Sequence, residues 1–305
     1  MPREIADFHQ VSKLDYGLVE SLRVNPRTGC VSWVDIENGT LSTLSTEVKG
    51  GEERVNLLPH ASFAESLPEL GYVFAAGQHL GVRDETGNVS LSPTLLSPGR
   101  RFNDGAIDKL GRLVIGSMNF DNSDNKNVLL LVELDGAITV LDSDLGLSNG
   151  IVVGPETGAL FSVDTLRRTV YRRDLDIETS VYGPRQVFAA FDPGENPDGI
   201  AYSATGHLVV ALWGSAAVAI LDASGREVQR VSVPPVFATS VCIRPDTGAL
   251  LVGGASQPRE KLTTATMTGG VWEAESWLEG YPVTTWSQPR NDYTMIKLGS
   301  QRVIV

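Results

Sequence analysis

Cysteine, histidine and long apolar runs are all scarce in this chain of 305 residues. Its two cysteines, Cys30 and Cys242, lie in separate apolar segments without a CxxC pair, which predicts buried, reduced thiols rather than disulfides or metal ligands. No apolar run approaches about 18 residues, and the N-terminal stretch MPREIADFHQ lacks the apolar core and cleavage site of a secretion signal. We therefore expect a cytoplasmic protein that neither spans nor binds a membrane.

Positive charge is sparse as well. The 25 Lys and Arg residues are scattered singly or in pairs against 37 Asp and Glu, which gives a net charge of −12. Without a basic stripe, nucleic acid is not an expected partner, whereas carboxylates gathered at one place would attract a cation. The four histidines fit neither a catalytic triad nor an HExxH motif, and no GxSxG motif is present. Covalent catalysis by an activated serine therefore has little support.

The chain contains instead a repeat of short β-rich segments. Alternating apolar runs are bounded by Gly, Asp, Asn and Pro, and long amphipathic helical patterns are rare. Six similar units follow one another at intervals of 40 to 48 residues, each with a glycine just before an apolar run. These glycines are Gly29, Gly71, Gly111, Gly158, Gly206 and Gly248. A period of this length predicts an all-β, six-bladed β-propeller of four-stranded antiparallel blades.

One propeller accounts for the whole chain, so we expect residues 1–305 to form a single domain. No linker rich in Pro, Gly or Ser divides it. A propeller ring often closes when a terminal strand completes the last blade. Residues near Ile5 to Val11 or the C-terminal MIKLGSQRVIV could supply that strand, and the sequence does not choose between them. The oligomeric state is also left open.

The segment RFNDG, from Arg101 to Gly105, has two interpretations. Asp-Gly between two β-runs is a strong hairpin signal, because Gly takes a positive φ easily. However, a polar residue followed by Gly or Ser and then by an apolar residue precedes five of the six repeat glycines. The polar residues are Glu20, Asp104, Asn149, Asp198 and Thr239. Since the innermost strands of a propeller begin around its central channel, we expect these side chains to converge there.

Converging carboxylates predict a bound cation. Glu20, Asp104, Asn149 and Asp198 would place three carboxylates and an amide in a partly desolvated space, where repulsion requires protonation or a metal. Oxygen ligands favour a hard divalent ion, above all Ca²⁺ or Mg²⁺, with Mn²⁺ acceptable and Zn²⁺ less expected. The competing interpretation is that each Asn-Gly or Asp-Gly is only a turn, which leaves Glu20 unexplained.

Several segments resemble the senescence-marker-protein, gluconolactonase and luciferin-regenerating-enzyme-like family, which includes regucalcin. They are VSWVDIENGTL, RFNDGAIDKLGRLVIGSM, LSNGIVV, TGALFSVDT and NPDGIAYSATGHLVVALWG, and they stand in the family's order. The resemblance extends from about Tyr16 to Trp272. It implies a six-bladed propeller with one divalent metal in the central channel, Ca²⁺ first. It also implies metal ligands at Glu20, Asn149 and Asp198.

The resemblance also implies a substrate pocket beside the metal. Substrate contacts would fall on Arg101, Asn103 and Asp121, and an acidic pocket residue on Asp104. The sequence departs from the family in two places. Leu-Val-Glu-Ser around Glu20 replaces the family's Gly-Glu-Gly-Pro, and the residues after Met118, including Asp121, follow no fixed family pattern.

Together these features predict a metal-dependent lactonase, a hydrolase that opens sugar (aldono-)lactones such as gluconolactone. The metal would polarise the ester carbonyl and position water. A carboxylate would take the proton of that water, because Ca²⁺ acidifies bound water less than Zn²⁺ does. Asp198 is the first candidate for this base and Asp104 the second. Arg101 and Asn103 would bind hydroxyls or stabilise the developing oxyanion.

Other interpretations stay open. The same ligands could hold a structural ion in a noncatalytic, calcium-binding or regulatory propeller, or serve a hydrolase of another ester or a phosphoester. Arg101 could instead make a surface ion pair, with Arg100 beside it. His60 could be a solvated loop residue rather than part of the pocket, and Trp213 is expected in the core. Specificity is expected to lie in loops such as GQHLGVRD, NFDNSDNKN and ASQPREKLTTATM.

Overall fold

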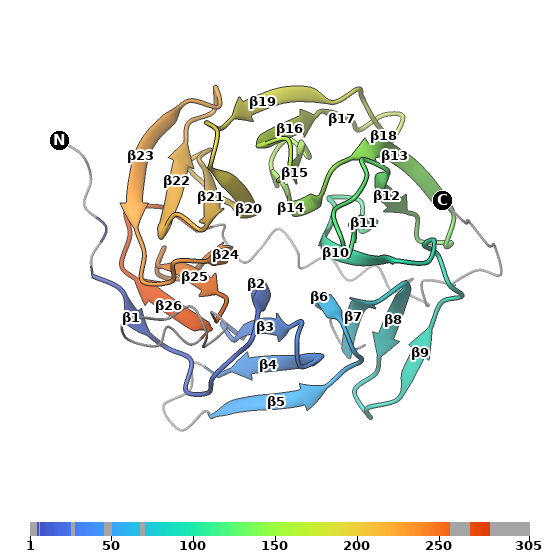
Figure 1. Ribbon diagram of the computed structural model, residues 1–305, viewed down its shortest axis with the longest axis horizontal. Coiled ribbons are helices and arrows are strands. Elements are labelled where there is room, and N and C mark those ends of the chain that lie inside the picture. The colour runs from blue at the N-terminus through green and yellow to red at the C-terminus, as the bar shows by residue number, and fades with distance from the viewer. Residues whose placement is uncertain are drawn as a thin grey trace.

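Six antiparallel sheets are arranged like the blades of a wheel in the computed structural model of the protein (Figure 1). The structure describes residues 5, 7–25, 28–45, 51–67, 71–256 and 269–280. Each of the six sheets has four strands, and the regular elements in these ranges are all strands. None of the described segments forms a helix of the length and apolarity needed to cross a membrane. The prediction of an all-β, six-bladed propeller with four-stranded blades is confirmed.

Blades 1 to 3 follow the chain from the innermost strand outward. Blade 1 consists of β2 (Val19–Val24), β3 (Val31–Asp35), β4 (Thr40–Leu44) and β5 (Glu52–Asn56). Blade 2 consists of β6 (Ala61–Leu67), β7 (Gly71–Ala76), β8 (His79–Arg83) and β9 (Val89–Leu91). Blade 3 consists of β10 (Arg100–Ile107), β11 (Leu113–Asn119), β12 (Asn127–Val132) and β13 (Ile138–Leu145).

Blades 4 to 6 complete the ring. Blade 4 consists of β14 (Ser148–Val153), β15 (Leu160–Asp164), β16 (Thr169–Arg173) and β19 (Gln186–Ala190). A small hairpin, β17 (Leu175–Asp176) and β18 (Val181–Tyr182), interrupts it. Blade 5 consists of β20 (Asn196–Tyr202), β21 (Leu208–Trp213), β22 (Ala217–Leu221) and β23 (Glu227–Ser232). Blade 6 consists of β24 (Ala238–Ile243), β25 (Leu250–Gly254), β26 (Gly270–Ala274) and β1 (His9–Gln10).

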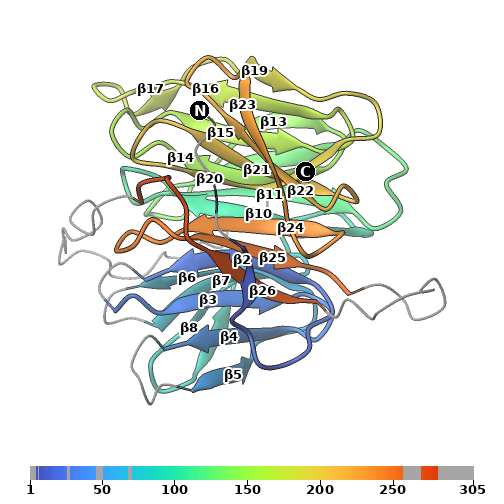
Figure 2. The ribbon, with the colours of Figure 1, turned by 90° about the vertical axis from the view of Figure 1, so that its left-hand side faces the viewer.

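The N-terminal strand supplies the outermost strand of the last blade. β1 pairs with β26, with His9 opposite Glu273 and Gln10 opposite Trp272. Seen from the side, β24 of the last blade lies beside β2 of the first (Figure 2). Of the two segments that could close the ring, the N-terminal one therefore does so. The C-terminal alternative, MIKLGSQRVIV, lies outside the described residues.

The repeat glycines mark the connection between the first and second strands of each blade. All six have positive φ values, from 68° to 89°, a conformation that glycine adopts without steric penalty. At Gly71 and Gly248 a Cβ would also lie only 2.0 and 2.2 Å from a backbone carbonyl oxygen of another segment. The period visible in the sequence therefore reports a steric requirement of each blade.

The core is divided among the six interfaces between adjacent blades. Each interface contains one cluster of buried apolar side chains, for example Phe63 and Val73 of blade 2 against Phe102 and Ile115 of blade 3. Because a blade in the ring is covered on both faces, strands such as β15 and β22 are buried at every position. The innermost strands are thereby held rigidly around the axis.

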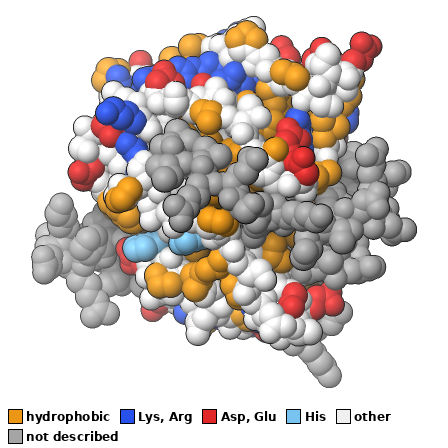
Figure 3. All heavy atoms as spheres, turned by 90° about the vertical axis from the view of Figure 1, so that its right-hand side faces the viewer, with side chains coloured by type: hydrophobic (Ala, Val, Ile, Leu, Met, Phe, Trp, Pro, Cys, Tyr) orange, Lys and Arg blue, Asp and Glu red, His pale blue; other side chains and the backbone are white. Residues whose placement is uncertain are grey.

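A charged clamp joins blades 3 and 4 at their periphery. Asp142 of β13 accepts hydrogen bonds from Arg173 at 2.6 Å and from Arg185 at 2.8 Å. Arg185 also contacts both carboxylate oxygens of Asp144 at 2.7 Å. These bonds from Arg185, and less so those from Arg167, lower the pKa of Asp144 to about 2. Basic and acidic side chains lie intermingled on the upper part of the face in Figure 3.

Removing the central carboxylate of this clamp should destabilise the fold. We expect Asp142→Asn to lower the free energy of unfolding by about 3 kcal/mol, because Arg173, only 7% exposed, keeps a buried charge without its partner. Asp174→Asn, which removes the exposed partner of the half-buried Arg172, should change it by less than about 0.5 kcal/mol. Equilibrium denaturation measures both values, and equal losses for the two variants would contradict the clamp.

The two thiols are free, as predicted, but both are half-buried rather than buried. Cys242 packs at the edge of the apolar cluster between blades 6 and 1. The surroundings of the Cys242 sulfur raise its pKa to about 11, chiefly by desolvation. This thiol is therefore protonated, and a poor nucleophile, at neutral pH.

Candidate functional site

Each innermost strand contains a β-bulge at the same place. The pairing with the second strand of the blade shifts register between Glu20 and Arg23, Ala61 and Phe63, Phe102 and Gly105, Ser148 and Ile151, Pro197 and Ile200, and Ala238 and Ser240. A bulge breaks the regular alternation of side chains and aims one of them in a new direction. The polar residues of the repeat stand in or beside these six bulges.

The hairpin interpretation of RFNDG is wrong. The whole of Arg100–Ile107 is one strand, β10, and Gly105 stands within it opposite Ile115. A Cβ on Gly105 would lie 2.7 Å from the Cδ1 atom of Ile115 and 3.0 Å from the carbonyl oxygen of Val114. Glycine is therefore required here for close packing after the bulge, rather than for the positive φ of a turn.

The innermost strands line the centre of the ring (Figure 1). Each of these strands carries at least one buried polar residue in or beside its bulge. The members of this buried polar set are Glu20, Ser62, Asn103, Asp104, Asn149, Asp198 and Thr239. The pattern of polar residue and glycine or serine had left blade 2 without a member. Ser62 fills that place, and it could have been found from spacing, since it precedes Gly71 by the same nine residues that separate Glu20 from Gly29.

A chain of hydrogen bonds connects the residues of RFNDG to blade 4. The Arg101 guanidinium donates to Asn103 Oδ1 at 2.7 Å and to the Phe102 carbonyl at 3.0 Å. Asn103 Nδ2 in turn donates to the Ser148 carbonyl at 2.9 Å and to Asn149 Oδ1 at 3.2 Å. Asn103 therefore links one predicted substrate contact, Arg101, to one predicted metal ligand, Asn149.

Two buried carboxyl groups face an electrostatically unfavourable setting. Burial first, then repulsion from Glu20 and Asp104, raises the pKa of Asp198 well above its usual value. Burial and then repulsion from Asp104 raise the pKa of Glu20 to about 8. Asp198 Oδ1 is buried and has no hydrogen-bond partner among the described residues. An oxygen atom in this state, with a second acidic group nearby, fits a site for a cation.

Arg101 is one of two positive charges near the candidate ligands, and Arg23 is the other. Arg101 is buried, and burial lowers its pKa to about 10, against the opposing effects of Glu20 and Asp198. Arg101 therefore does not form the surface ion pair that the adjacent Arg100 had suggested. Arg100 makes that pair instead, with Asp124 at 2.6 Å. Since its pKa is about 10, Arg101 keeps its charge at neutral pH and can interact with an anionic group in the channel.

Asp104 lies in the same channel but has its carboxylate engaged. Oδ1 accepts a hydrogen bond from the Gly105 backbone N–H at 2.8 Å and lies 3.5 Å from Arg23 Nη2. Oδ2 accepts one from the Ile151 N–H at 3.0 Å. Arg23 also contacts Glu65 at 3.2 Å and donates to the Gly105 carbonyl at 2.6 Å. Asp104 therefore ties the innermost strand of blade 3 to those of blades 1 and 4.

Asp121 lies in the turn that follows β11 and is exposed. It accepts hydrogen bonds from Asn119 Nδ2 at 3.0 Å and from the Ser123 N–H at 3.1 Å. The bonds from Ser123 lower its pKa. These local contacts stabilise the turn and do not join Asp121 to the buried set, so its role in substrate binding stays a prediction.

Two aromatic pairs stand at ends of strands near the start of the innermost strands. His60 is exposed, and its ring packs edge-on against Phe120 at 5.3 Å. Trp213, at the end of β21, is half-buried rather than part of the core, and packs against Phe237 at 4.6 Å. His60 is thus accessible to solvent, as expected of a loop residue.

The candidate metal ligands include an amide as well as carboxylates, so they do not form a purely acidic or sulfur cluster. Within the residues that the structure describes, no group of three or more His, Cys, Asp or Glu side chains is arranged to hold a metal ion. The set predicted here combines two carboxylates, Glu20 and Asp198, with the amide of Asn149. A mixed oxygen set of this composition, completed by water, suits a hard cation such as Ca²⁺.

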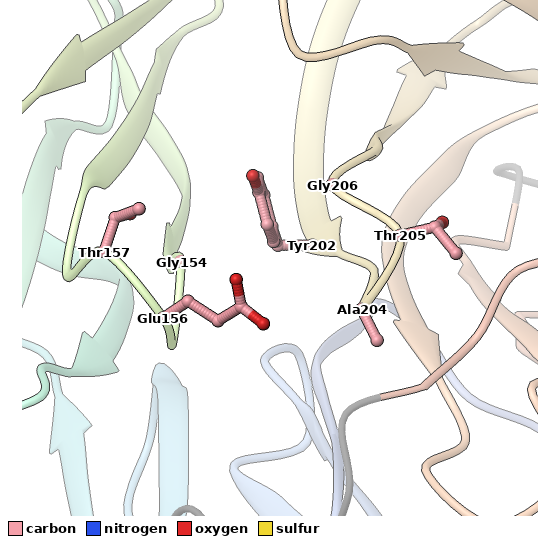
Figure 4. Close-up of a pocket in the computed structure, with 7 residues that line it drawn as sticks. All are labelled: Gly154, Glu156, Thr157, Tyr202, Ala204, Thr205 and Gly206. Carbon is pink, nitrogen blue, oxygen red and sulfur yellow. The ribbon is translucent and has the colours of Figure 1, made fainter.

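A separate hollow lies between the turns that follow β14 and β20. It is lined by Gly154, Glu156, Thr157, Tyr202, Ala204, Thr205 and Gly206. Figure 4 shows Glu156 and Tyr202 pointing into it, whereas Thr205 points away. It lies beyond the far ends of the strands that carry Asn149 and Asp198. None of the predicted site residues lines this hollow.

Two curated proteins and one solved structure show what the chain is similar to. Pentonolactonase XacC of Haloferax volcanii is 30% identical over 223 residues, which cover 72% of this chain and 75% of that protein. The 6-deoxy-6-sulfogluconolactonase of Pseudomonas putida is 28% identical over 216 residues, 68% of this chain and 73% of that protein. The structure of regucalcin, a calcium-binding protein from Agrobacterium tumefaciens, has a TM-score of 0.82 at 24% identity and covers 90% of this chain and 95% of its own.

The sequence model of one family covers most of the chain. The SMP-30/Gluconolactonase/LRE-like region matches residues 18–256, an interval that includes every member of the buried polar set from Glu20 to Thr239. The solved structure above shows that the shared fold is the six-bladed propeller. The chain belongs to the SMP-30/gluconolactonase/LRE-like family.

Proposed function

We propose that this protein is a metal-dependent lactonase that hydrolyses sugar lactones. The observation that carries the proposal is the buried Oδ1 atom of Asp198, which has no hydrogen-bond partner in the described part of the chain and lies near Glu20, Asn149 and the charged Arg101. Relatives named as a pentonolactonase and a 6-deoxy-6-sulfogluconolactonase support a small lactone as the substrate. Both names denote lactones of sugar acids, which supports aldonolactones over other esters.

The proposed ligands of the metal are Glu20, Asn149 and Asp198. They offer oxygen atoms only, which supports Ca²⁺ first, with Mg²⁺ or Mn²⁺ as substitutes and Zn²⁺ less suited. When bound, such an ion polarises the lactone carbonyl and neutralises the two buried carboxylates. Burial and repulsion between carboxylates raise the pKa values of Glu20 and Asp198, and a bound cation would favour their ionised forms.

Side chains of the protein would supply the general base, the oxyanion contact and the substrate contacts. Asp198, whose Oδ1 is free to accept a proton, is the proposed general base for the attacking water. Arg101 would stabilise the negative charge that develops on the carbonyl oxygen, because it is a buried cation fixed by Asn103. Asn103 and Asp121 are the proposed contacts for substrate hydroxyls. Asp104, which the sequence named as the second candidate base, is better suited to holding strands, since both of its oxygens accept backbone hydrogen bonds.

A lactone panel with and without chelator tests the proposal. We expect the purified protein to open gluconolactone or a pentonolactone faster than the spontaneous reaction, to lose this activity in EDTA, and to regain it with Ca²⁺. Acid release followed with a pH indicator measures the rate. Turnover that persists after complete metal removal would contradict the metal-dependent mechanism. If chelation instead lowers only the unfolding temperature and no lactone is turned over, the ion is structural and the propeller noncatalytic.

A further inference from the structure

Each bulge raises the question of which donor binds the backbone carbonyl oxygen at that point of the strand. Where a strand bulges, the ladder of backbone hydrogen bonds is interrupted, so a carbonyl at that point needs another donor. In four blades this carbonyl belongs to the residue directly before a candidate site residue, namely Glu20, Asn103, Asn149 or Asp198. The four carbonyls belong to Val19, Phe102, Ser148 and Pro197. Each of these four oxygens accepts a hydrogen bond from a side chain.

In every case the donor comes from the preceding blade. Thr239 of blade 6 donates to the Val19 carbonyl of blade 1. Ser62 of blade 2 donates to the Phe102 carbonyl of blade 3 at 3.0 Å. Asn103 of blade 3 donates to the Ser148 carbonyl of blade 4 at 2.9 Å. Thr165, which follows β15 in blade 4, donates to the Pro197 carbonyl of blade 5 at 2.8 Å. The same arrangement thus occurs in four of the six blades, directly before the three residues assigned to the metal and before Asn103.

Thr165 has a second contact that bears on the ligand set. Its hydroxyl oxygen accepts a hydrogen bond from Asn149 Nδ2 at 3.2 Å while its own proton goes to the Pro197 carbonyl. Thr165 therefore holds the nitrogen end of the Asn149 amide, and Oδ1, which accepts one hydrogen bond from Asn103 at 3.2 Å, keeps a second lone pair for a cation. One hydroxyl thus orients Asn149 and fixes the backbone just before Asp198.

Thr239 has the corresponding place behind Glu20. Its side chain is fully buried, and the hydroxyl donates to the carbonyl of the residue before Glu20. The pattern in the sequence placed Thr239 among the side chains that converge on the channel. Its hydrogen bond instead directs it to the neighbouring backbone, which explains how a threonine can occupy this register without being a ligand.

We propose that Thr165 and Thr239 are positioning residues of the metal centre, acting on Asn149 and Asp198 and on Glu20, respectively. The inference rests on the proposed function, since it assumes that these three side chains bind the ion. Groups that orient metal ligands through hydrogen bonds typically change affinity by about 10- to 100-fold when they are removed. The effect should therefore appear in metal affinity, separately from the stability of the fold.

The test compares variants that keep the shape of threonine or keep its hydroxyl. Thr165→Val and Thr239→Val remove the hydrogen bonds at nearly constant volume, and Thr165→Ser and Thr239→Ser retain the hydroxyl. Thr40→Val is the matched control, because Thr40 is a buried threonine whose hydroxyl has no partner among the described residues. Isothermal titration of the full, metal-free chain with Ca²⁺ measures the dissociation constant of each protein.

We expect each valine variant to bind Ca²⁺ at least about tenfold more weakly than the wild type. The serine variants and Thr40→Val should stay within about twofold, because the donors to the channel carbonyls are intact in them. Circular dichroism confirms that each variant is folded before titration. If one valine variant does not fold, the valine variant at the other threonine still tests the inference.

Two results would overturn the inference, and they differ in what they say about the function. If the wild type binds Ca²⁺ and the valine variants bind it equally well, the threonines do not position the ligands and the metal centre itself stands. If the wild type binds neither Ca²⁺, Mg²⁺ nor Mn²⁺, the proposed metal centre fails and this inference fails with it.

Discussion

Replacement of Asp198 by Asn is expected to lower kcat for lactone hydrolysis by about a hundred- to ten-thousandfold, the range that general bases contribute. The amide keeps the shape of the side chain but cannot accept the proton of water, and it removes one of the two negative charges assigned to the metal. Rates at saturating Ca²⁺ and saturating lactone measure the effect. The same variant should be more resistant to thermal unfolding than the wild type when both are metal-free, because a buried and repelled carboxylate is gone.

The opposite signs of these two effects make the prediction specific. A variant that had lost activity through misfolding would lose stability as well. Asp176→Asn, in the exposed hairpin of β17 and β18, serves as the control, and it should leave turnover unchanged. If Asp198→Asn keeps more than a tenth of the wild-type kcat, Asp198 is not the base.

The stability of the metal-free protein is expected to fall as the pH rises from about 4.5 to about 8. Within this window the folded protein holds a proton on Glu20 that the unfolded chain has released, since folding raises the pKa of this group from 4.5 to about 8. A folded state that binds more protons than the unfolded one becomes less stable with increasing pH, by up to about 1.4 kcal/mol per pH unit for each such group. The raised pKa of Asp198 acts in the same direction.

Bound Ca²⁺ should remove this dependence, because it takes the place of the proton. The stabilisation by Ca²⁺ is therefore expected to increase with pH across the same window. Denaturant unfolding at pH 5, 6, 7 and 8, with EGTA or with Ca²⁺, measures both curves. Glu20→Gln in EGTA should show a shallower slope than the wild type. Parallel slopes for these two proteins would mean that Glu20 is not the buried proton carrier.

The fold could be predicted because each blade requires a feature that is visible in sequence. The connection between its first two strands needs a residue with positive φ, and glycine supplies it at Gly29, Gly111 and their four equivalents. The closing strand could not be predicted in the same way. His9 and Gln10 are two exposed residues without any alternating pattern, and only their pairing with β26 identifies them.

The burial of the candidate site residues on the innermost strands was predictable, but the direction of neighbouring side chains was not. The register of the repeat brought Glu20, Asn149 and Asp198 to the centre of the ring, where the structure has them buried. Asn103 and Asp104 are adjacent in sequence, yet their side chains point to different partners. The Asn103 carboxamide donates to Asn149, whereas the Asp104 carboxylate accepts hydrogen bonds from backbone N–H groups. This difference arises from the bulge between Phe102 and Gly105, which depends on the pairing of two strands rather than on either sequence alone.

Closure of the ring by the N-terminal strand also affects how the protein folds during translation. β1 is translated before β2 to β25, whereas its partners Trp272 and Glu273 in β26 are translated after them, so this pairing forms late. Until β1 docks, β26 presents an open edge of unpaired backbone groups, which is a template for pairing with another chain. Contacts between such distant segments also form slowly. Aggregation during expression should therefore be decided at this step, and changes at the N-terminus should affect yield more than they affect the finished enzyme.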